Sequence, residues 1–357
     1  MANILFGEAD TISELNTSWH RCRVPAQILN ERGHHCIVTH ITNLIPEHPD
    51  PKIQEAIKGA DVIVLERLLV SDIHPRIKEW KEIGKRVIST FDDAYHLLPD
   101  SGGVPKRTWR GGKKIVSGHN ADGSEKLGAI LNQFREGLRL VDTALVPSKV
   151  LLEDYKLFCP TIQFVPNILH PDLWKDLKRR PLDNNFMILW GGSSAHDISW
   201  RDSGLPQALG IICKRYPRVH LHIQSRDPRI LILLDKANLQ GRYTSAMWIP
   251  FQSWPGVVVQ GDLYVMPLAG SYDLRRSSLK QVEAGMAKIP WVASNLAPYQ
   301  GGVGGILVEN RVTDWVNAIS TLIEDKELRD KMSEEGHNSA MVLYNGAGEM
   351  YEKSLSI

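Results

Sequence analysis

The stretch from Asp262 to Ser294 decides the fold of the chain, and it reads DLYVMPLAGSYDLRRSSLKQVEAGMAKIPWVAS. It begins and ends with apolar, strand-like runs, and the residues between them predict a helix over Leu279–Ala287. Lys280 and Glu283 fall in the first turns of that helix, where a core helix rarely carries charge without a partner. The stretch therefore predicts a strand–helix–strand unit of a parallel sheet whose charged side chains hold something.

The same alternation of strand-like and helical stretches extends along the chain in both directions. Strands are expected at 2–8, 35–41, 61–67, 85–91, 143–148 and 161–167, and then at 186–192, 219–225, 247–251, 262–268, 289–294 and 304–309. Such alternation is typical of α/β proteins with helices on both faces of a parallel sheet. We expect two Rossmann-like, doubly wound domains that face each other across a cleft, with ligands at the carboxyl ends of the strands.

The length of the chain and its composition agree with two globular domains. It has 357 residues, of which 43% are apolar and 23% are charged. The polar segment 169–185 predicts a boundary near Arg180, which gives domains at 1–180 and 181–335 and a closing helix at 336–357 that packs back on the first domain. The formal net charge of +1 excludes a global field that would attract nucleic acid or a membrane.

The cysteines and the start of the chain favour a cytoplasmic protein. The four cysteines lack C-x-x-C spacing, which argues against a zinc site or a redox motif and favours reduced thiols. The chain opens on a strand-like run without the pattern of a signal peptide, and no apolar run approaches the ~20 residues of a membrane span. No D-x-D triplet occurs, which is consistent with an enzyme that needs no metal.

Six segments of the chain resemble, in the correct order, those of a known enzyme family. They are LNERGHHCIVTHI (29–41), DTALVPSKVLLEDY (142–155), IQFVPNILHPDLW (162–174), DLYVMPL (262–268), SSLKQVEAGMAKIPWVAS (277–294) and GILVENRVTDWVNAISTLIEDKELRDKM (305–332). The chain thereby resembles the GT-B-fold glycosyltransferases of the group 1 or family 4 type, the large retaining group that includes sucrose and glycogen synthases. The resemblance implies transfer of a sugar from a UDP- or GDP-sugar, with retention and without a cofactor.

The resemblance also implies functions for Lys280 and Glu283, the two charged residues in the first turns of the predicted helix. In this family the glutamate at the position of Glu283 accepts hydrogen bonds from ribose hydroxyls, and a carboxylate can take both. The start of the helix would bind the diphosphate, and Lys280 would stabilise its departure as a catalytic residue. The other predicted donor-binding residues here are Arg276, Ser277, Ser278 and Leu279. Alternatively, Ser278 only caps a helix whose charged residues lie on a solvated face.

The chain departs from the family at two places. Arg275 stands eight positions before Glu283, where many members carry a second glutamate that touches the transferred sugar. The segment LWGGSSAHDISWRD lacks the usual arginine and lysine after the first strand of the second domain. Gly191 and Gly192 would instead let the backbone approach the phosphates, and His196 would donate to phosphate or sugar. A structural role for His196 is the alternative.

Two features of the first half concern the acceptor. Asp92 and Asp93 follow a strand and are predicted catalytic residues that deprotonate or orient an acceptor hydroxyl. The alternatives are hydrogen bonds to hydroxyls of the donor sugar, or a helix cap with a solvated neighbour. The basic segment 105–120 contains the predicted acceptor-binding residues Arg107, Trp109, Arg110, Lys113 and Lys114. It would grip an anionic acceptor, unless it is a solvated loop.

These residues do not identify the acceptor. A glycan or glycolipid is what the family implies, and a hydroxymethylated base in DNA is the rival that the basic segment favours. Two other functions also remain open. A nucleotide-sugar epimerase shares the architecture, and Arg275 in place of a glutamate leaves room for a binder of sugar nucleotides without catalytic activity.

Overall fold

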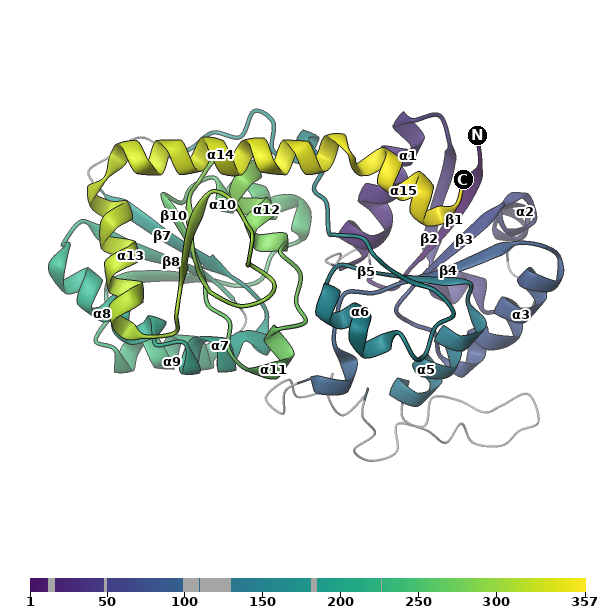
Figure 1. Cartoon of the computed structure of the whole chain (residues 1–357), viewed down its shortest axis with the longest axis horizontal. Helices are drawn as coiled ribbons and strands as arrows, with labels where there is room; N and C mark the ends of the chain where they lie inside the picture. The colour runs from purple at the N-terminus through teal and green to yellow at the C-terminus, as the bar shows by residue number, and fades with distance from the viewer. Residues whose placement is uncertain (12–16, 48–49, 99–108, 110–129, 181–184, 226) are drawn as a thin grey trace. The chain divides into compact units, whose positions relative to one another are not determined.

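The computed structural model describes residues 1–11, 17–47, 50–98, 109, 130–180, 185–225 and 227–357. Two compact units make up the chain, which we call unit 1 (Met1–Ile168 with Gly346–Ile357) and unit 2 (Leu169–Asn345). Each unit contains a parallel sheet with helices packed against it (Figure 1). The predicted α/β class with two Rossmann-like domains is confirmed. Among the described residues, no helix has the length and apolar character needed to cross a bilayer.

The sheet of unit 1 changes its winding direction next to its first strand. Its described strands, in the order β2-β1-β3-β4-β5-β6, are parallel throughout. They span Asn3–Glu8 (β1), His35–His40 (β2), Val62–Glu66 (β3), Arg86–Thr90 (β4), Thr143–Val146 (β5) and Ile162–Phe164 (β6). The helices are α1 (Val24–Glu31), α2 (Pro51–Gly59), α3 (His74–Glu82), α5 (Ile130–Leu140), α6 (Lys149–Tyr155) and α15 (Ala347–Leu355). Connections leave β1 and β3 toward opposite sides, so a crevice is expected at their carboxyl ends.

Unit 2 has the same kind of switch point, between β7 and β10. Its described strands lie in the order β12-β11-β10-β7-β8-β9 and are parallel. They span Phe186–Gly191 (β7), Val219–Gln224 (β8), Tyr243–Ala246 (β9), Leu263–Met266 (β10), Trp291–Ser294 (β11) and Gly305–Val308 (β12). The helices are α7 (Asp197–Asp202), α8 (Leu205–Arg215), α9 (Pro228–Lys236), α10 (Trp254–Val258), α11 (Gly270–Asp273), α12 (Leu279–Met286), α13 (Val312–Glu324) and α14 (Lys326–Asn345).

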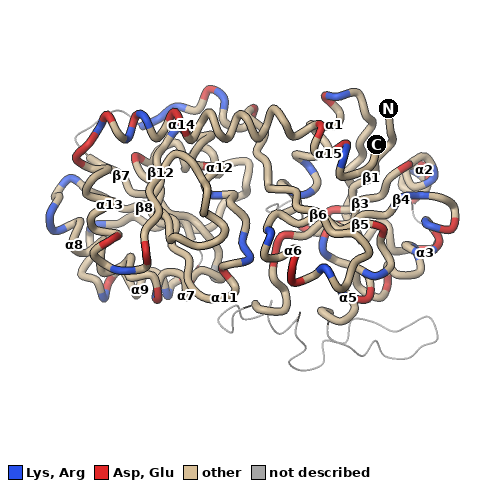
Figure 2. The backbone as a smooth tube through the Cα atoms, viewed as in Figure 1, with Lys and Arg blue, Asp and Glu red and all other residues tan. Residues whose placement is uncertain are grey.

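The central strands of unit 2 form because they can be buried on both faces. Their sequences contain no Lys, Arg, Asp or Glu, and the charged residues of this unit lie on its helices and loops (Figure 2). Residues of β10 and β11 are buried throughout, as expected for central strands of a covered parallel sheet. Large side chains such as Trp190, Trp291 and Trp315 fill the core, and each contributes roughly 1.5–3 kcal/mol or more by leaving water.

The segment before the expected boundary at Arg180 belongs to unit 2. Arg179 donates hydrogen bonds to the carbonyl oxygens of Val259 (3.3 Å) and Gly261 (2.9 Å), and Arg180 forms an ion pair with Asp262. These contacts attach the polar segment to the loop before β10. The units therefore divide between Ile168 and Leu169, ahead of the polar stretch.

The closing helix of the chain divides at Gly346. The helix α14 lies against α12 within unit 2, where a Cβ on Gly285 would stand 2.5 Å from the carbonyl oxygen of Gly336. The helix α15 belongs to unit 1 and packs on α1, where Arg32 and Glu352 form a bidentate ion pair. The predicted closing helix, expected to begin at residue 336, therefore starts inside α14, which belongs to unit 2. The part that packs on unit 1 is α15.

The expected strand over 247–251 is wrong, and β9 lies just before it at Tyr243–Ala246. The strand pairs with β8 alone, from Leu221 opposite Tyr243 to Gln224 opposite Ala246. An edge strand needs fewer apolar residues, so its sequence YTSA gives a weak signal. The more apolar run that follows contains Pro250, which has no N–H to give to a ladder.

Candidate functional site

Lys280 lies at the switch point of unit 2, in the first turn of α12. Its ammonium donates hydrogen bonds to the hydroxyl of Tyr264 (3.1 Å) and to the carbonyl oxygen of Gly191 at the end of β7. It also lies 5.8 Å from the ring centroid of Trp190 and 5.4 Å from that of Tyr264, within cation–π range. Burial lowers the pKa of Lys280 to about 8, against the opposing effect of Glu283. The charge of Lys280 is held in place by both central strands.

Glu283 completes this network one turn further along α12. Its side chain is 4% exposed, and it accepts a hydrogen bond from the Tyr264 hydroxyl (3.1 Å). Burial raises the pKa of Glu283, while Lys280 and the hydrogen bond from Tyr264 oppose the rise. Glu283 therefore does not lie on a solvated face. We call Lys280, Tyr264 and Glu283, with the Gly191 carbonyl, the α12 network.

The turn that opens α12 is arranged by Ser277. The hydroxyl of Ser277 accepts a hydrogen bond from the backbone N–H of Leu279 (3.4 Å). Ser278 occupies the N-cap position with φ −78° and ψ 14°, and its side chain makes no capping hydrogen bond within the described residues. Capping by the Ser278 side chain, the alternative function for this residue, is therefore wrong. The predicted contacts of this turn with a diphosphate remain predictions.

Asp273 organises the loops beside the α12 network, and the sequence analysis missed it. Its carboxylate is 2% exposed and accepts hydrogen bonds from the Ala269 N–H (2.8 Å), the Ser199 hydroxyl (2.5 Å) and Nε of Arg276 (2.7 Å). Arg276 also donates to the carbonyl oxygen of Ala195 (3.3 Å). Asp273 thus joins the loop after β7 to the loop after β10. The one sequence signal for this role of Asp273 was its spacing of three residues from Arg276, which allows an ion pair on one face of a helix.

His196 is buried within the same group of loops. Its ring stands edge-on to Trp190 at a centroid distance of 5.5 Å, and its Nδ1 lies 3.5 Å from the Ser199 hydroxyl oxygen. Burial lowers the pKa of His196 well below its ordinary value, and the positive charges of Arg276 and Lys280 lower it further. The imidazole is therefore neutral at physiological pH.

Gly191 and Gly192 are required by the aromatic side chains around them. A Cβ on Gly191 would lie 2.2 Å from the Trp254 ring. A Cβ on Gly192 would lie 2.7 Å from the Trp190 ring and 2.9 Å from Cδ2 of His196. Packing alone explains why both positions lack a side chain. Their approach to phosphates remains a prediction.

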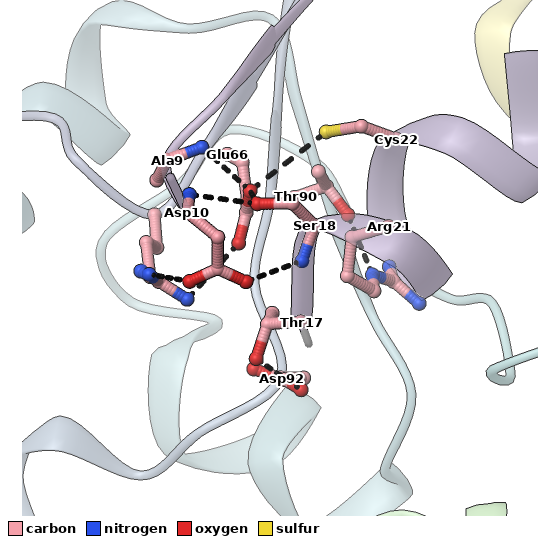
Figure 3. Close-up of polar contacts among 10 residues, drawn as sticks. Ala9, Asp10, Thr17, Ser18, Arg21, Cys22, Glu66, Thr90 and Asp92 are labelled. Carbon is pink, nitrogen blue, oxygen red and sulfur yellow. Dashed lines mark hydrogen bonds and ion pairs between the residues drawn. The ribbon is translucent and has the colours of Figure 1, made fainter. Parts of the chain in front are cut away.

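A second polar group lies at the carboxyl ends of β1 and β3 in unit 1, and the sequence analysis missed it as well (Figure 3). Glu66 ends β3 with a side chain that is 0% exposed. Its carboxylate accepts hydrogen bonds from the Ala9 N–H (2.8 Å), the Ser18 hydroxyl and Arg67 (3.1 Å). Asp10 pairs with Arg67 and accepts from the Ser18 N–H (3.0 Å). We call Glu66, Arg67, Asp10 and Ser18 the Glu66 cluster.

The backbone at the Glu66 cluster is strained. Arg67 has a φ of +35°, which is uncommon for a residue with a side chain. The Leu68 N–H bonds to the carbonyl oxygen of Glu66, so the chain turns sharply at the end of β3. Burial raises the pKa of Glu66, and the charge of Arg67 opposes the rise. Two ion pairs of Arg67, one with the buried Glu66 and one with Asp10, hold this strained turn in place.

Asp92 lies close to the Glu66 cluster, just after β4. Its carboxylate accepts a hydrogen bond from the Thr17 hydroxyl (3.3 Å), and Thr17 directly precedes Ser18 (Figure 3). Burial and the neighbouring charge of Asp93 raise the pKa of Asp92 to about 7. Both aspartates are half-buried. A carboxyl group that titrates near neutral pH suits proton transfer.

The basic segment lies mostly outside the described residues. Arg107, Arg110, Lys113 and Lys114 are all among the residues that the structure does not describe. Trp109 is described, and its ring stacks on Tyr95 with a centroid distance of 3.8 Å and meets Phe134 edge to face. Trp109 is 9% exposed, and one face of its ring is covered by Tyr95 of the same unit. Acceptor binding by these residues remains a prediction.

Comparisons with known proteins bear on the fold. No protein-family model matches the chain, and no curated protein matches it. Among solved structures, sucrose-phosphate synthase from Thermosynechococcus elongatus is similar with a TM-score of 0.64 and 14% identity, over 98% of each chain. The glycosyltransferase WaaG, involved in lipopolysaccharide biosynthesis, has a TM-score of 0.63 and 12% identity, over 98% of this chain and 99% of its own. Anabaena HepE, in complex with UDP, has a TM-score of 0.62 and 14% identity, over 99% of this chain and 100% of its own. Such matches over nearly the full length, with two parallel six-stranded sheets in the described residues, show that the chain has the fold of the GT-B glycosyltransferases.

Proposed function

We propose that the chain is a glycosyltransferase that moves a sugar from a nucleotide-sugar donor to an acceptor hydroxyl. The observation that carries the proposal is the α12 network, which places a half-buried lysine and a buried glutamate at the β7–β10 switch point. Ligands of open α/β sheets bind at such points. The fold shared with known glycosyltransferases supports the same conclusion.

Unit 2 would bind the donor. Glu283 would accept hydrogen bonds from the ribose hydroxyls, and Lys280 with Arg276 and the start of α12 would bind the diphosphate. These groups would stabilise the departing diphosphate without a metal ion and without a cofactor. UDP is the first nucleotide to test because the similar HepE was solved with UDP, and GDP is the second.

Unit 1 would contribute to the acceptor side, with transfer by retention. Asp92 or Asp93 would accept or orient the proton of the acceptor hydroxyl, which a carboxyl group with a pKa of about 7 can do. A glycan or glycolipid acceptor is favoured by the neutral charge of the chain and by the similar WaaG, which is involved in lipopolysaccharide biosynthesis. A hydroxymethylated base in DNA is the rival acceptor, which the basic segment 105–120 favours.

The proposal is tested with a calorimetric screen of UDP- and GDP-sugars, followed by mass spectrometry with glycan, glycolipid and modified-DNA acceptors. Transfer of a hexose mass to an acceptor is the expected result. Conversion of the donor to an epimer in the absence of acceptor would identify an epimerase instead. Binding without transfer or hydrolysis would identify a non-catalytic binder. DNA binding with a steep salt dependence would favour the nucleic-acid acceptor.

Glu283→Gln is expected to weaken UDP binding about 10- to 150-fold, the equivalent of roughly 1.5–3 kcal/mol for a hydrogen bond to a charged group. The amide keeps the volume of the side chain but has no charge and one acceptor oxygen. Isothermal titration calorimetry gives the dissociation constant. Glu334→Gln is the matched control, because Glu334 is exposed and pairs with Lys288 in the same unit. Equal affinities of the wild type and Glu283→Gln would reject the ribose assignment.

Asp92→Asn is expected to reduce turnover by about 10²–10⁴-fold while donor affinity stays within twofold, because a general base contributes on that scale. In the wild type, the rate should rise with pH through about 7 as Asp92 loses its proton, and then level. The variant should lose that rise. The pH profile of kcat/KM measures it. Near-normal turnover of both Asp92→Asn and Asp93→Asn would leave the aspartates a structural role only.

A further inference from the structure

A chain of three side chains in unit 2 fixes the position of one proton. The carboxylate of Asp273 can only accept hydrogen bonds, so the Ser199 hydroxyl gives it its single proton across 2.5 Å. The Ser199 oxygen then has only lone pairs to offer toward Nδ1 of His196, 3.5 Å away. Nδ1 must carry a hydrogen for this contact to be attractive. Because the ring is neutral, its other nitrogen, Nε2, carries none.

The alternative arrangement is disfavoured by the other contacts of Asp273. The same carboxylate accepts hydrogen bonds from the Ala269 N–H (2.8 Å) and from Arg276 (2.7 Å), so both of its oxygens already serve as acceptors. If Nδ1 were unprotonated, Ser199 would have to serve two acceptors with one proton. If that proton went to Nδ1, the oxygens of Ser199 and Asp273 would face each other at 2.5 Å with no proton between them, which is repulsive.

We propose that Asp273, acting through Ser199, holds His196 in the Nδ1–H tautomer, so that Nε2 accepts a hydrogen bond from a hydroxyl of the donor sugar. The proposal rests on the proposed function for its ligand. Asp273 and Ser199 are positioning residues, and His196 is the residue that meets the donor. Under this proposal His196 accepts from the sugar, in place of the expected donation to phosphate or sugar, because an Nε2 without a hydrogen repels an anionic oxygen that also only accepts.

The surroundings of His196 agree with a contact to a sugar hydroxyl. Its Cδ2, the ring atom next to Nε2, lies 2.9 Å from where a Cβ on Gly192 would stand, so this edge borders the carboxyl end of β7. Two cations close to the ring, Arg276 and Lys280, are available for the phosphates. Glu283 is available for the ribose. A hydroxyl on the transferred sugar is the remaining donor group that matches a bare imidazole nitrogen.

The tautomer is tested first, in the protein without ligand. Long-range ¹H–¹⁵N NMR of protein with ¹⁵N-labelled histidines distinguishes a protonated from an unprotonated ring nitrogen, and His196→Gln identifies the His196 signals. We expect a single Nδ1–H tautomer in the wild type and a gain of the Nε2–H tautomer in Ser199→Ala and Asp273→Asn. Ser203→Ala is the control, since Ser203 is a buried serine just after α7 whose hydroxyl donates to the carbonyl oxygen of Trp200 and accepts from the N–H of Leu205. An Nε2–H tautomer in the wild type, or no change in Ser199→Ala, would overturn the proposal.

The ligand is tested next, with UDP, GDP, UDP-glucose and GDP-mannose as probes. The His196 Nε2 signal should shift with a sugar nucleotide and stay in place with the matching nucleoside diphosphate. His196→Gln places an acceptor oxygen near the position of Nε2, whereas His196→Asn places it near Nδ1. We expect His196→Asn to raise the donor KM about 2- to 12-fold more than His196→Gln does.

The two proposals fail in different ways. An equal Nε2 shift with UDP and with UDP-glucose would overturn the sugar contact while leaving glycosyl transfer intact. Failure of the sugar nucleotides to bind at all would contradict the proposed function, and the tautomer of the unliganded protein would still decide the role of Asp273.

Discussion

Lys280→Met is expected to lower kcat/KM about 10²–10³-fold, the scale on which one preorganised donor to a developing negative charge contributes to catalysis. Methionine keeps the length and most of the volume of the side chain but removes the ammonium. The ammonium holds Tyr264 and the Gly191 carbonyl, and it offsets the buried charge of Glu283. Both nucleotide binding and the departure of the diphosphate should therefore weaken.

The pH dependence of nucleotide binding gives Lys280 a signature of its own. Because the pKa of Lys280 is lowered to about 8, the free protein begins to lose this charge above pH 8. Only the protonated amine attracts a diphosphate, so UDP affinity should fall up to tenfold per pH unit above about pH 8. Binding there should take up a proton, which calorimetry in buffers of different ionisation enthalpy detects. Lys280→Met should show neither effect.

Lys288→Met is the matched control for Lys280→Met. Lys288 lies at the other end of the same helix, is 53% exposed and pairs with Glu334 at 3.7 Å. Its loss should leave kcat/KM within twofold of the wild type, since exposed ion pairs contribute about 0–1 kcal/mol to stability. If Lys280→Met retained wild-type kcat/KM and the wild-type pH dependence of UDP binding, Lys280 would hold unit 2 together without acting on the donor.

Glu66→Ala is expected to destabilise unit 1 by about 2–5 kcal/mol, because Arg67, which is 21% exposed, loses one of its two carboxylate partners and keeps Asp10. The affected charge is that of Arg67, whose pKa is raised by Glu66 and Asp10 in the folded protein. The Ala9 N–H and the Ser18 hydroxyl also lose their acceptor. The strained turn at Arg67 would then have less to hold it.

Hydrogen exchange of the backbone amides in β1 and β3 measures this effect within unit 1, where a single unfolding transition cannot be assumed. Glu66→Gln should destabilise less than Glu66→Ala, because the amide oxygen still accepts from Ala9 or Ser18. The control is Glu79→Ala, whose residue is 48% exposed and pairs with Arg76 in α3. If Glu66→Ala exchanged no faster than Glu79→Ala, the cluster would not stabilise the turn.

The sequence predicted the apolar strands and missed β9, a polar strand at the edge of its sheet. Runs such as those of β7 and β10 are apolar because helices cover both sides of the sheet, so composition alone predicts them. The edge strand β9 is half-exposed and polar, and the stronger apolar signal beside it misled the prediction. The short helices α7, α10 and α11 gave no clear periodicity, because each has six residues or fewer.

Some residues of the candidate site could be predicted from the sequence, and others were found only in the structure. Lys280 and Glu283 could be predicted because two charges in an otherwise apolar helix lack a local explanation. Asp273 and Glu66 were missed because, apart from Arg276 and Arg67, the side-chain partners described for them lie far away in the sequence. Ser199 lies 74 positions from Asp273, and Ser18 lies 48 positions from Glu66. In the run DVIVLER, however, a buried strand ends in a carboxylate, Glu66. That position at a strand end is the one sequence signal that could have identified Glu66 as a candidate site residue.

The sequence by itself determined the α/β class and the repeated strand–helix order, because local hydrophobic periodicity reports burial directly. It also determined that charges stand at the start of α12. Only the tertiary structure decided what those charges meet, since the order of strands in a sheet brings together residues far apart in the chain. The neighbours β7 and β10 place Gly191 against Lys280, which stands 89 positions later. The tautomer of His196 is decided one step further still, by Asp273, a carboxylate from the segment after β10 that reaches His196 through Ser199 in the segment after β7.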